Sequence, residues 1–279
     1  QEKPDIILAM PEKVNVWTVL FLLGTGVPVV VSERNDPNRH PENKIKRILR
    51  RLVYPFANGF IFQTQDAADY FPKSIRKRGV VLDNPLDTSR IPARYEGERR
   101  RVIAAAGRLH EQKNFDLLIR AFARFYKTHH TYSLVIYGEG PEKEHLMQTA
   151  NRLGIAGAVE LPGQSKTLLE DINDCAMFVL SSDYEGMPNA LIEAMACGLS
   201  CVATDCPIGG VRSLISDGEN GLLIPVRSER AMVQAMTKLA DDAALAELLG
   251  NRAAGIRERL DETLVAAKWR QYLETIADR

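Results

Sequence analysis

Short apolar runs alternate along the chain with longer stretches in which apolar positions recur every three or four residues. The runs are rich in Val, Ile and Ala and are continuous rather than alternating, which indicates strands covered on both faces. Ten such runs predict ten strands: Asp5–Ala9, Val27–Ser32, Gly59–Thr64, Gly79–Asn84, Arg101–Gly107, Ser133–Gly138, Ala158–Gly163, Ala176–Ser182, Leu199–Asp205 and Asn220–Pro225. Strands of this kind that alternate with helices predict an α/β chain with doubly wound parallel sheets.

The periodic pattern breaks between residues 84 and 101, where two prolines, a glycine and five arginines occur. We therefore predict a partial, Rossmann-like first domain over residues 1–88, a linker over 89–100 and a second Rossmann-like domain over 101–260. The last stretch, 261–279, predicts a helix with one apolar face that packs back across the domains. The first domain holds four predicted strands and opens abruptly on one of them. We expect it to lack the strand, glycine-containing turn and helix with which such a domain begins.

Composition and charge limit the classes of function. The chain has 279 residues, of which 45% are hydrophobic and 26% are charged, as in ordinary globular proteins. No apolar run reaches the roughly 18 residues of a membrane-spanning helix. The net charge of zero argues against bulk nucleic-acid binding. Residues 1–100 hold 17 Lys and Arg against 12 Asp and Glu, a net charge of +5, which leaves −5 for the remainder and suggests that the two halves meet different ligands.

The four cysteines do not form a metal-binding pattern. Cys175, Cys197, Cys201 and Cys206 contain no C-x-x-C pair and have no histidine pair at ligand spacing. Buried, reduced thiols of a cytoplasmic protein are the expectation, and we predict no bound metal.

A first candidate site follows the strand that opens the second domain. In open parallel sheets, ligands bind beyond the carboxyl ends of the strands. Gly107 ends such a strand, and Arg108 and Lys113 follow it at the start of a predicted helix. Two cations beside a helix N-terminus favour an anion such as a diphosphate. The alternative is a pair of solvated surface cations.

A second candidate site lies in the sequence SDYEGMPNALIEAMACG. Glu185 is in the loop after a predicted strand, and Pro188 suits the first turn of the helix that follows, whose free N–H groups favour an anion. Glu193 lies inside this apolar helix. Burying a carboxylate without a partner costs several kcal/mol, so Glu193 needs one. The two hydroxyls of a ribose suit it; a structural bond to the backbone or to a distant arginine is the alternative.

Together these stretches resemble a known enzyme family. Residues 107–122, 134–146, 181–210 and 217–226 look like successive blocks of the family 4 retaining glycosyltransferases, which have the GT-B fold, two Rossmann-like domains that face each other across a cleft. Glu185 and Glu193 match the E-x7-E motif of that family. The first half is similar to the branch that builds bacterial surface polysaccharides and lipid-linked oligosaccharides, including N-acetylgalactosaminyltransferases.

The resemblance implies retaining transfer of a sugar from a nucleoside diphosphate sugar, either a UDP-N-acetylhexosamine or a UDP-hexose. The acceptor would be a hydroxyl of a growing, lipid-linked surface glycan, and neither a metal nor another cofactor is expected. It implies catalytic roles for Arg108 and Lys113 on the donor diphosphate and for Glu185 on the donor sugar, with Glu193 on the ribose. The other donor-binding positions that it implies are Gly107, Gly138, Gly140, Pro162, Gly163, Gly186, Met187, Pro188 and Asn189.

The first domain departs from the family pattern. Many members carry a histidine after the strand that corresponds to residues 27–32, whereas this chain has Glu33, Arg34 and Asn35, which we assign to the acceptor side. The stretch Asn43–Phe56 predicts a basic amphipathic helix. One hypothesis is that this helix rests on the anionic inner face of the cytoplasmic membrane; a solvated helix with an ordinary core face is the other.

Three other functions are alternatives to this one. A nicotinamide oxidoreductase would need G-x-G-x-x-G after a strand, and the nearest match, GEGPEK at 138–143, lacks the third glycine. A nucleotide-sugar epimerase of the same fold would share the nucleotide cleft but need no acceptor. A nucleotide-sugar-binding subunit without transfer activity is the third possibility.

Overall fold

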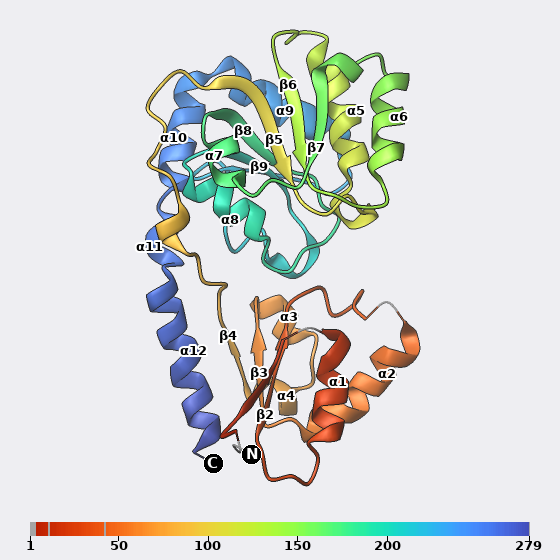
Figure 1. Cartoon of the computed structure of the whole chain (residues 1–279), viewed down its shortest axis with the longest axis vertical. Helices are drawn as coiled ribbons and strands as arrows, with labels where there is room; N and C mark the ends of the chain where they lie inside the picture. Colours follow the sequence, from red (N-terminus) through yellow and green to blue (C-terminus); the bar gives the residue numbers. More distant parts are fainter. Residues whose placement is uncertain (1–3, 11, 42, 279) are drawn as a thin grey trace.

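A computed structural model describes residues 4–10, 12–41 and 43–278, which form two α/β domains, each built on one sheet (Figure 1). The first sheet has the order β1-β2-β3-β4, and all its strands are parallel. These strands are β1 (Ile7–Ala9), β2 (Val29–Glu33), β3 (Gly59–Phe62) and β4 (Gly79–Val81).

The second sheet is also parallel and has the order β10-β9-β8-β5-β6-β7. Its strands are β5 (Arg100–Ala106), β6 (Ser133–Tyr137), β7 (Val159–Gly163), β8 (Cys175–Leu180), β9 (Ser200–Thr204) and β10 (Leu222–Ile224). All ten predicted strands are confirmed, and most are shorter than predicted. Some residues near the predicted strand ends, such as Gln63 and Asn84, lie in loops instead, and their side chains bond to the other domain.

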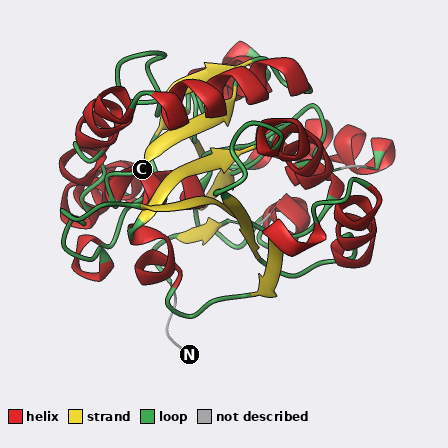
Figure 2. Ribbon diagram, turned by 90° about the horizontal axis from the view of Figure 1, so that it is seen from above, coloured by secondary structure: helices red, strands yellow, loops and turns green. Residues whose placement is uncertain are grey.

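Helices lie on both sides of the strands (Figure 2). In the first domain they are α1 (Glu12–Phe21), α2 (Lys44–Val53), α3 (Gln65–Asp69) and α4 (Lys73–Arg76). In the second they are α5 (Phe115–Tyr126), α6 (Lys143–Arg152), α7 (Leu168–Asn173), α8 (Asn189–Ala196), α9 (Glu229–Asp241), α10 (Ala243–Ala253), α11 (Ile256–Arg259) and α12 (Glu262–Ala277). Short 3₁₀ helices occur at Tyr54–Phe56, Thr88–Arg90, Glu111–Lys113, Ala156–Ala158 and Pro207–Gly209. Within the described ranges, no helix has the length and apolar character needed to cross a membrane.

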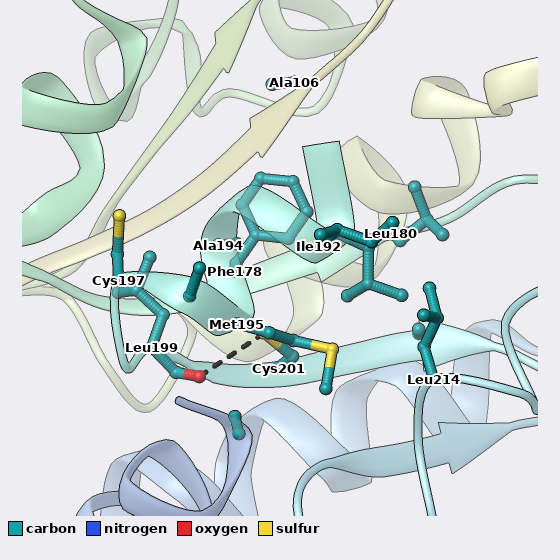
Figure 3. Packing of buried hydrophobic residues seen from close by; sticks show 14 of the residues in the cluster. Ala106, Phe178, Leu180, Ile192, Ala194, Met195, Cys197, Leu199, Cys201 and Leu214 are labelled. Atoms are coloured by element: carbon teal, nitrogen blue, oxygen red, sulfur yellow. Dashed lines mark hydrogen bonds between the residues drawn. The ribbon is translucent and has the colours of Figure 1, made fainter. Parts of the chain in front are cut away.

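The second sheet is covered on both faces, which explains its continuous apolar runs. Successive residues of β5 alternate between two buried clusters: Ile103 and Ala105 belong to one, Ala104 and Ala106 to the other. Both clusters contain fully buried residues of β8 as well, because β5 and β8 are neighbours at the centre of the sheet. Figure 3 shows how side chains of α8 pack with Phe178 of β8 in one of these clusters. The start of α8 is therefore fixed by the core behind it.

The last helix, α12, leaves the second domain and lies against the first sheet (Figure 1). The Tyr272 hydroxyl donates to the Arg78 carbonyl at 2.5 Å and accepts from the Phe60 amide at 2.8 Å. The Trp269 indole donates to the Asp83 carbonyl at 3.1 Å. The outgoing and returning chains also meet, because the Leu86 amide bonds to the Leu260 carbonyl at 2.7 Å. This helix therefore ties the two domains together.

Candidate active site

The loops that follow β5 and β8 are bonded to each other at the carboxyl edge of the second sheet. The Asp183 amide donates to the Gln112 carbonyl, and the Gln112 side chain donates to the Tyr184 carbonyl, both at 2.9 Å. The Ser181 hydroxyl donates to the Lys113 carbonyl at 2.7 Å. Because β5 and β8 are adjacent parallel strands, their carboxyl ends bring these loops together.

Two residues of the predicted site meet in this loop pair. Lys113 Nζ lies 2.6 Å from Glu185 Oε1, although the two residues are 72 positions apart. The Ser182 hydroxyl donates to the same carboxylate oxygen at 2.6 Å. The exposed fraction of the side chain is only 16% for Lys113 and 8% for Glu185. The structure thus brings together a nearly buried cation and carboxylate at the edge where a ligand of a parallel sheet binds.

The predicted glycines line this edge because the backbones approach closely. A Cβ atom on Gly107 would lie 2.9 Å from Cε of Lys113, so the lysine side chain passes directly over this glycine. A Cβ on Gly138 would lie 1.9 Å from the Gly107 carbonyl oxygen, and one on Gly140 would lie 2.2 Å from that of Leu109. The Gly138 amide in turn donates to the Gly163 carbonyl at 2.8 Å. Larger residues at these positions would push the strand ends apart.

The loop that carries Glu185 also touches the first domain. The Met187 amide donates to Oε1 of Gln63 at 3.1 Å. The Asn84 side-chain amide donates to the Met187 carbonyl at 3.3 Å and to Oδ1 of Asn189 at 2.7 Å. Gln63 and Asn84 are almost fully buried, and they are bonded to each other at 2.6 Å. We call these four residues, Gln63, Asn84, Met187 and Asn189, the interdomain clasp.

Beside the clasp, the backbones of the two domains also come into close contact. A Cβ on Gly186 would lie 2.3 Å from the Arg34 carbonyl oxygen of the first domain. Arg34 donates from Nη2 to Oδ1 of Asn84 at 2.6 Å. This arginine, which the sequence assigned to the acceptor side, thus contacts the clasp. Gly186 is therefore required because the two domains approach each other at this point.

The start of α8 differs in two details from the prediction. Pro188 is the N-cap and Asn189 is the first helical residue, whereas the sequence indicated Pro188 in the first turn. The N–H group of Met187, a donor-binding position implied by the resemblance, is not free for an anion, because it already donates to Gln63. The helix start is thus partly used to hold the domains together.

Glu193 lies on α8 beside the linker rather than beside Lys113. It lines a small pocket of about 140 Å³ together with Arg90 and Asn189. Within the described part of the chain, the Glu193 carboxylate forms no hydrogen bond or ion pair. Burial raises the pKa of Glu193, and the positive charge of Arg90 acts in the opposite direction. Of the structural partners considered for Glu193, only Arg90 acts on it, and only through its charge. A ligand hydroxyl can reach the carboxylate through the pocket.

The other predicted donor-site residues lie around this edge. Pro162 and Gly163 are in β7, where Pro162 is exposed and Gly163 is buried. Arg108 is exposed and lines a pocket between the domains, which Asn35 lines as well as Gln112 and Tyr184 of the loop pair. Within the described residues, no group of three or more His, Cys, Asp or Glu side chains could hold a metal ion.

Glu33 does not reach this cleft. It is 1% exposed and its carboxylate lies 3.4 Å from Arg50, which is equally buried. The Tyr54 hydroxyl also bonds to Glu33. Burial, together with the neighbouring Glu33, raises the pKa of Tyr54 well above its usual value. In this structure Glu33 therefore belongs to a buried polar cluster with Arg50 and Tyr54.

Sequence reasoning missed Gln63 and Asn84. Both are polar residues at the end of an apolar strand run, which is the position from which side chains of a parallel sheet reach a ligand or a facing domain. That signal was present in the sequence. To interpret it, one must know which loop of the second domain lies opposite Gln63 and Asn84, and the sequence alone does not specify that loop.

Comparison with known proteins places the chain in a family. The sequence model of the family described as glycosyl transferases group 1 matches residues 88–255. The chain is 30% identical over 278 residues to the N-acetylgalactosamine-N,N'-diacetylbacillosaminyl-diphospho-undecaprenol 4-alpha-N-acetylgalactosaminyltransferase of Campylobacter jejuni, covering 97% of this chain and 74% of that one.

Solved structures share the two-domain arrangement. The fold matches Anabaena HepE in complex with UDP-glucose with a TM-score of 0.87 at 19% identity, covering 99% of this chain and 79% of that chain. It matches S. aureus TarM, solved with UDP, with a TM-score of 0.83 at 20% identity, covering 96% of this chain but 55% of that chain. The chain thus spans about three quarters of the Campylobacter relative and little more than half of TarM. By its sequence and its two facing parallel-sheet domains, the chain belongs to the glycosyl transferases group 1 family and has the GT-B fold.

Proposed function

We propose that the protein transfers a sugar from a UDP-sugar to a hydroxyl of a lipid-linked glycan, with retention at the anomeric carbon. In this step, the bond between the anomeric carbon and the diphosphate breaks, and the bond to the acceptor oxygen forms. The proton of the acceptor hydroxyl leaves with the departing diphosphate. The donor would be a UDP-N-acetylhexosamine or a UDP-hexose, without a metal.

One observation carries the donor site, namely the pairing of Lys113 and Glu185 over Gly107 at the carboxyl edge of the second sheet. Negative charge develops on the leaving diphosphate in the transition state, and a fixed cation at that position lowers its energy. Glu185, held by Ser182, orients Lys113 and can accept hydrogen bonds from sugar hydroxyls. Glu193 in its pocket beside the linker would bind the ribose.

A ligand panel tests the donor site. UDP, GDP and ADP, each with its sugars, would be added in a thermal-shift experiment. A ligand at about 100 times its dissociation constant stabilises the folded state by roughly 2.7 kcal/mol. We expect UDP and UDP-sugars to raise the unfolding midpoint most. If no nucleotide raises it, the donor site is wrongly assigned.

A reaction assay separates the proposed activity from its alternatives. The protein would be incubated with UDP-sugars, with and without a glycan on an isoprenoid diphosphate. Transfer that needs this acceptor supports the proposal. Formation of an epimer without acceptor indicates a nucleotide-sugar epimerase, and binding without any product indicates a binding subunit. The name of the Campylobacter relative, which includes a diphospho-undecaprenol group, favours the first outcome.

The proposal includes contact with an anionic membrane through the face of α1 and α2. We define the α1–α2 ridge as Trp17, Phe21, Ile45, Ile48, Leu52 and Phe56, the last of which lies in the 3₁₀ helix that follows α2. All six side chains are at least half exposed, and Phe21 and Ile45 reach 77% and 73%. Lys44, Lys46 and Arg51 are exposed on the same helix as Ile45. Apolar side chains with cations around them match the surface of an anionic bilayer.

Sedimentation with liposomes tests this contact. We expect binding to vesicles that contain anionic lipid and little binding to neutral ones. Ile45→Asp with Leu52→Asp should abolish binding, whereas Leu248→Asp, on the exposed surface of α10 in the second domain, should leave it intact. Equal binding to both kinds of vesicle, or loss of binding in the Leu248 variant alone, would contradict the proposal.

A further inference from the structure

A second side-chain link joins the two loops that carry Lys113 and Glu185. The Asn114 side-chain amide donates to Oδ1 of Asp183 at 2.9 Å. Asn114 directly follows Lys113, and Asp183 precedes Glu185 by two positions. The ion pair and this hydrogen bond therefore connect the same two loops at neighbouring positions. We call Asn114 and Asp183 the loop latch.

Asn114 sets the direction in which the chain leaves Lys113. Its backbone is left-handed, with φ 46° and ψ 45°, a conformation that asparagine adopts more readily than most residues. This turn ends the 3₁₀ helix Glu111–Lys113 and begins α5, whose Leu117 amide donates to the Asn114 side-chain oxygen at 3.3 Å. The side-chain nitrogen donates to Asp183. One side chain thus connects α5, the turn after Lys113 and the facing loop.

Asp183 is fixed through both of its carboxylate oxygens. Oδ1 accepts from Asn114, and Oδ2 accepts from Nη2 and Nε of Arg227, at 2.5 and 2.9 Å. The side chain of Asp183 is only 12% exposed, whereas that of Arg227 is 68% exposed. Hydrogen bonds to an ionised acceptor are stronger than those between neutral groups. A nearly buried carboxylate with these partners can therefore hold the turn after Lys113 in one place.

The loop latch lies apart from the pocket between the domains. Its two residues line a pocket of about 320 Å³ on the side of α5 and α6, together with Arg120 and His145. Neither residue of the loop latch is among the described lining residues of the pocket to which Arg108 belongs. The effect of the loop latch on a donor in the cleft would therefore pass through the loops that it joins.

We infer that Asp183 is a positioning residue for the donor diphosphate, because its bond to Asn114 holds Lys113 in place. The inference rests on the proposed function, in which Lys113 stabilises the charge of the leaving diphosphate. A cation lowers the energy of that charge most when it is already held where the charge develops. The ion pair with Glu185 fixes the end of the lysine side chain, and the loop latch fixes the backbone from which it extends.

A double-mutant cycle with Asp183→Ala and Lys113→Met tests the inference through calorimetric binding of UDP to the full chain. If Asp183 acts through Lys113, the effects of the two changes are not additive. We expect Asp183→Ala to weaken UDP binding roughly fivefold when Lys113 is present, and less than about twofold in the Lys113→Met background. Asp205→Ala is the matched control, because it removes a carboxylate that Arg212 holds through two nitrogens directly after β9. It should leave the affinity unchanged.

An exchange of the two residues separates their mutual bond from any general effect on folding. Asn114→Asp alone places two carboxylates opposite each other, and it should weaken UDP binding roughly tenfold. Adding Asp183→Asn restores one carboxylate and one amide donor, with their places exchanged and the total charge of the pair unchanged. We expect the affinity of this double variant to return to within about threefold of that of the unchanged protein.

The outcomes separate the inference from the proposed function. Additive effects in the cycle would show that Asp183 supports the fold only, and an exchange variant that binds UDP no better than Asn114→Asp would show that the bond is not involved. Either result overturns the inference. If the unchanged protein binds no UDP, the donor site and the inference are both wrong. Coupled UDP binding without sugar transfer to any acceptor would overturn the proposed function and leave the positioning role.

Discussion

At the scale of single residues, Glu193 shows a conflict between stability and binding. Its carboxylate is partly buried and has no hydrogen-bond donor among the described residues, and burial raises its pKa. A carboxyl whose pKa is raised on folding favours the folded state while protonated, below its unfolded pKa, and this contribution is lost as pH rises through the folded pKa. At neutral pH the charged form of Glu193 therefore destabilises the free protein, which is the expected cost of a residue kept for a ligand.

Replacing Glu193 with glutamine tests this interpretation. Because the amide carries no charge, we expect Glu193→Gln to unfold at a higher temperature than the unchanged protein at pH 7, with the gain disappearing below about pH 4, where the carboxyl is protonated. UDP should bind roughly tenfold to a hundredfold more weakly, since a charged acceptor is lost. Differential scanning fluorimetry and calorimetry measure the two effects. Unchanged UDP affinity would remove Glu193 from the donor site.

The Lys113–Glu185 pair makes a second prediction at this scale. Both side chains are nearly buried, so removing one leaves the other charge without its partner. We expect Lys113→Met to lower the free energy of unfolding by about 2–4 kcal/mol. Adding Glu185→Gln should recover most of that loss, because the pair then contains no isolated charge. Urea unfolding of the two single variants and the double variant measures the coupling.

The same series separates stability from function. UDP binding should remain weak in the Lys113→Met, Glu185→Gln double variant even where stability returns. A double variant that binds UDP as well as the unchanged protein would show that the pair is structural only. Glu229→Gln, which removes a partly exposed carboxylate that pairs with the exposed Arg120 and Arg124, serves as the control and should change neither property by much.

At the scale of elements, the interdomain clasp joins the ends of β3 and β4 to the loop before α8. Asn84 is its centre, because it accepts from Gln63 and Arg34 and donates to Met187 and Asn189. Four groups would lose a partner if Asn84 were removed. The clasp thus holds the backbone between Glu185 and α8 from the side of the first domain, whereas Met187 and α8 pack on the core of the second.

We therefore predict that Asn84→Ala affects turnover more than donor binding. The kcat should fall roughly tenfold as the loop loses its fixed position, while the KM for the UDP-sugar changes less than about threefold. Asn58→Ala, which removes a side-chain bond within the first domain only, serves as the control. Small-angle X-ray scattering should show a larger radius of gyration for the Asn84 variant alone. Equal loss of kcat in both variants would indicate general destabilisation instead.

The sequence was sufficient for the elements and insufficient for the contacts between them. Continuous apolar runs specify strands buried on both faces, and all ten were found in this way. The sequence predicted that Lys113 and Glu185 belong to two sites at the same edge of the sheet, but it did not predict that their side chains form an ion pair. Glu33 is the last residue of β2, and its side chain points toward Arg50 of α2, which lies 17 residues further along the chain. Such pairings follow from three-dimensional neighbours, which periodicity along the chain does not specify.

At the scale of the whole molecule, the four cysteines all lie in the second domain, where they are buried and free. The core cluster that contains them also packs the inner face of α8, so that loosening this core would displace the start of α8. Burial raises the pKa of the Cys175 thiol to about 11 and those of Cys197 and Cys206 to about 12, and it raises that of Cys201 as well. Each thiol thus retains its proton in the folded state where the unfolded chain loses it.

This difference predicts an alkaline limit to stability. A group whose pKa is raised on folding contributes stability below its unfolded pKa, about 8.5 for cysteine, and loses it as pH rises toward the folded value. Between about pH 9 and 11, four thiols should together cost roughly 5 kcal/mol per pH unit, since one proton corresponds to about 1.4 kcal/mol. Urea unfolding across this range measures the slope, and Cys201→Ala should reduce it by about one quarter. The same slope in that variant would show that other groups, and not the buried thiols, set the alkaline limit.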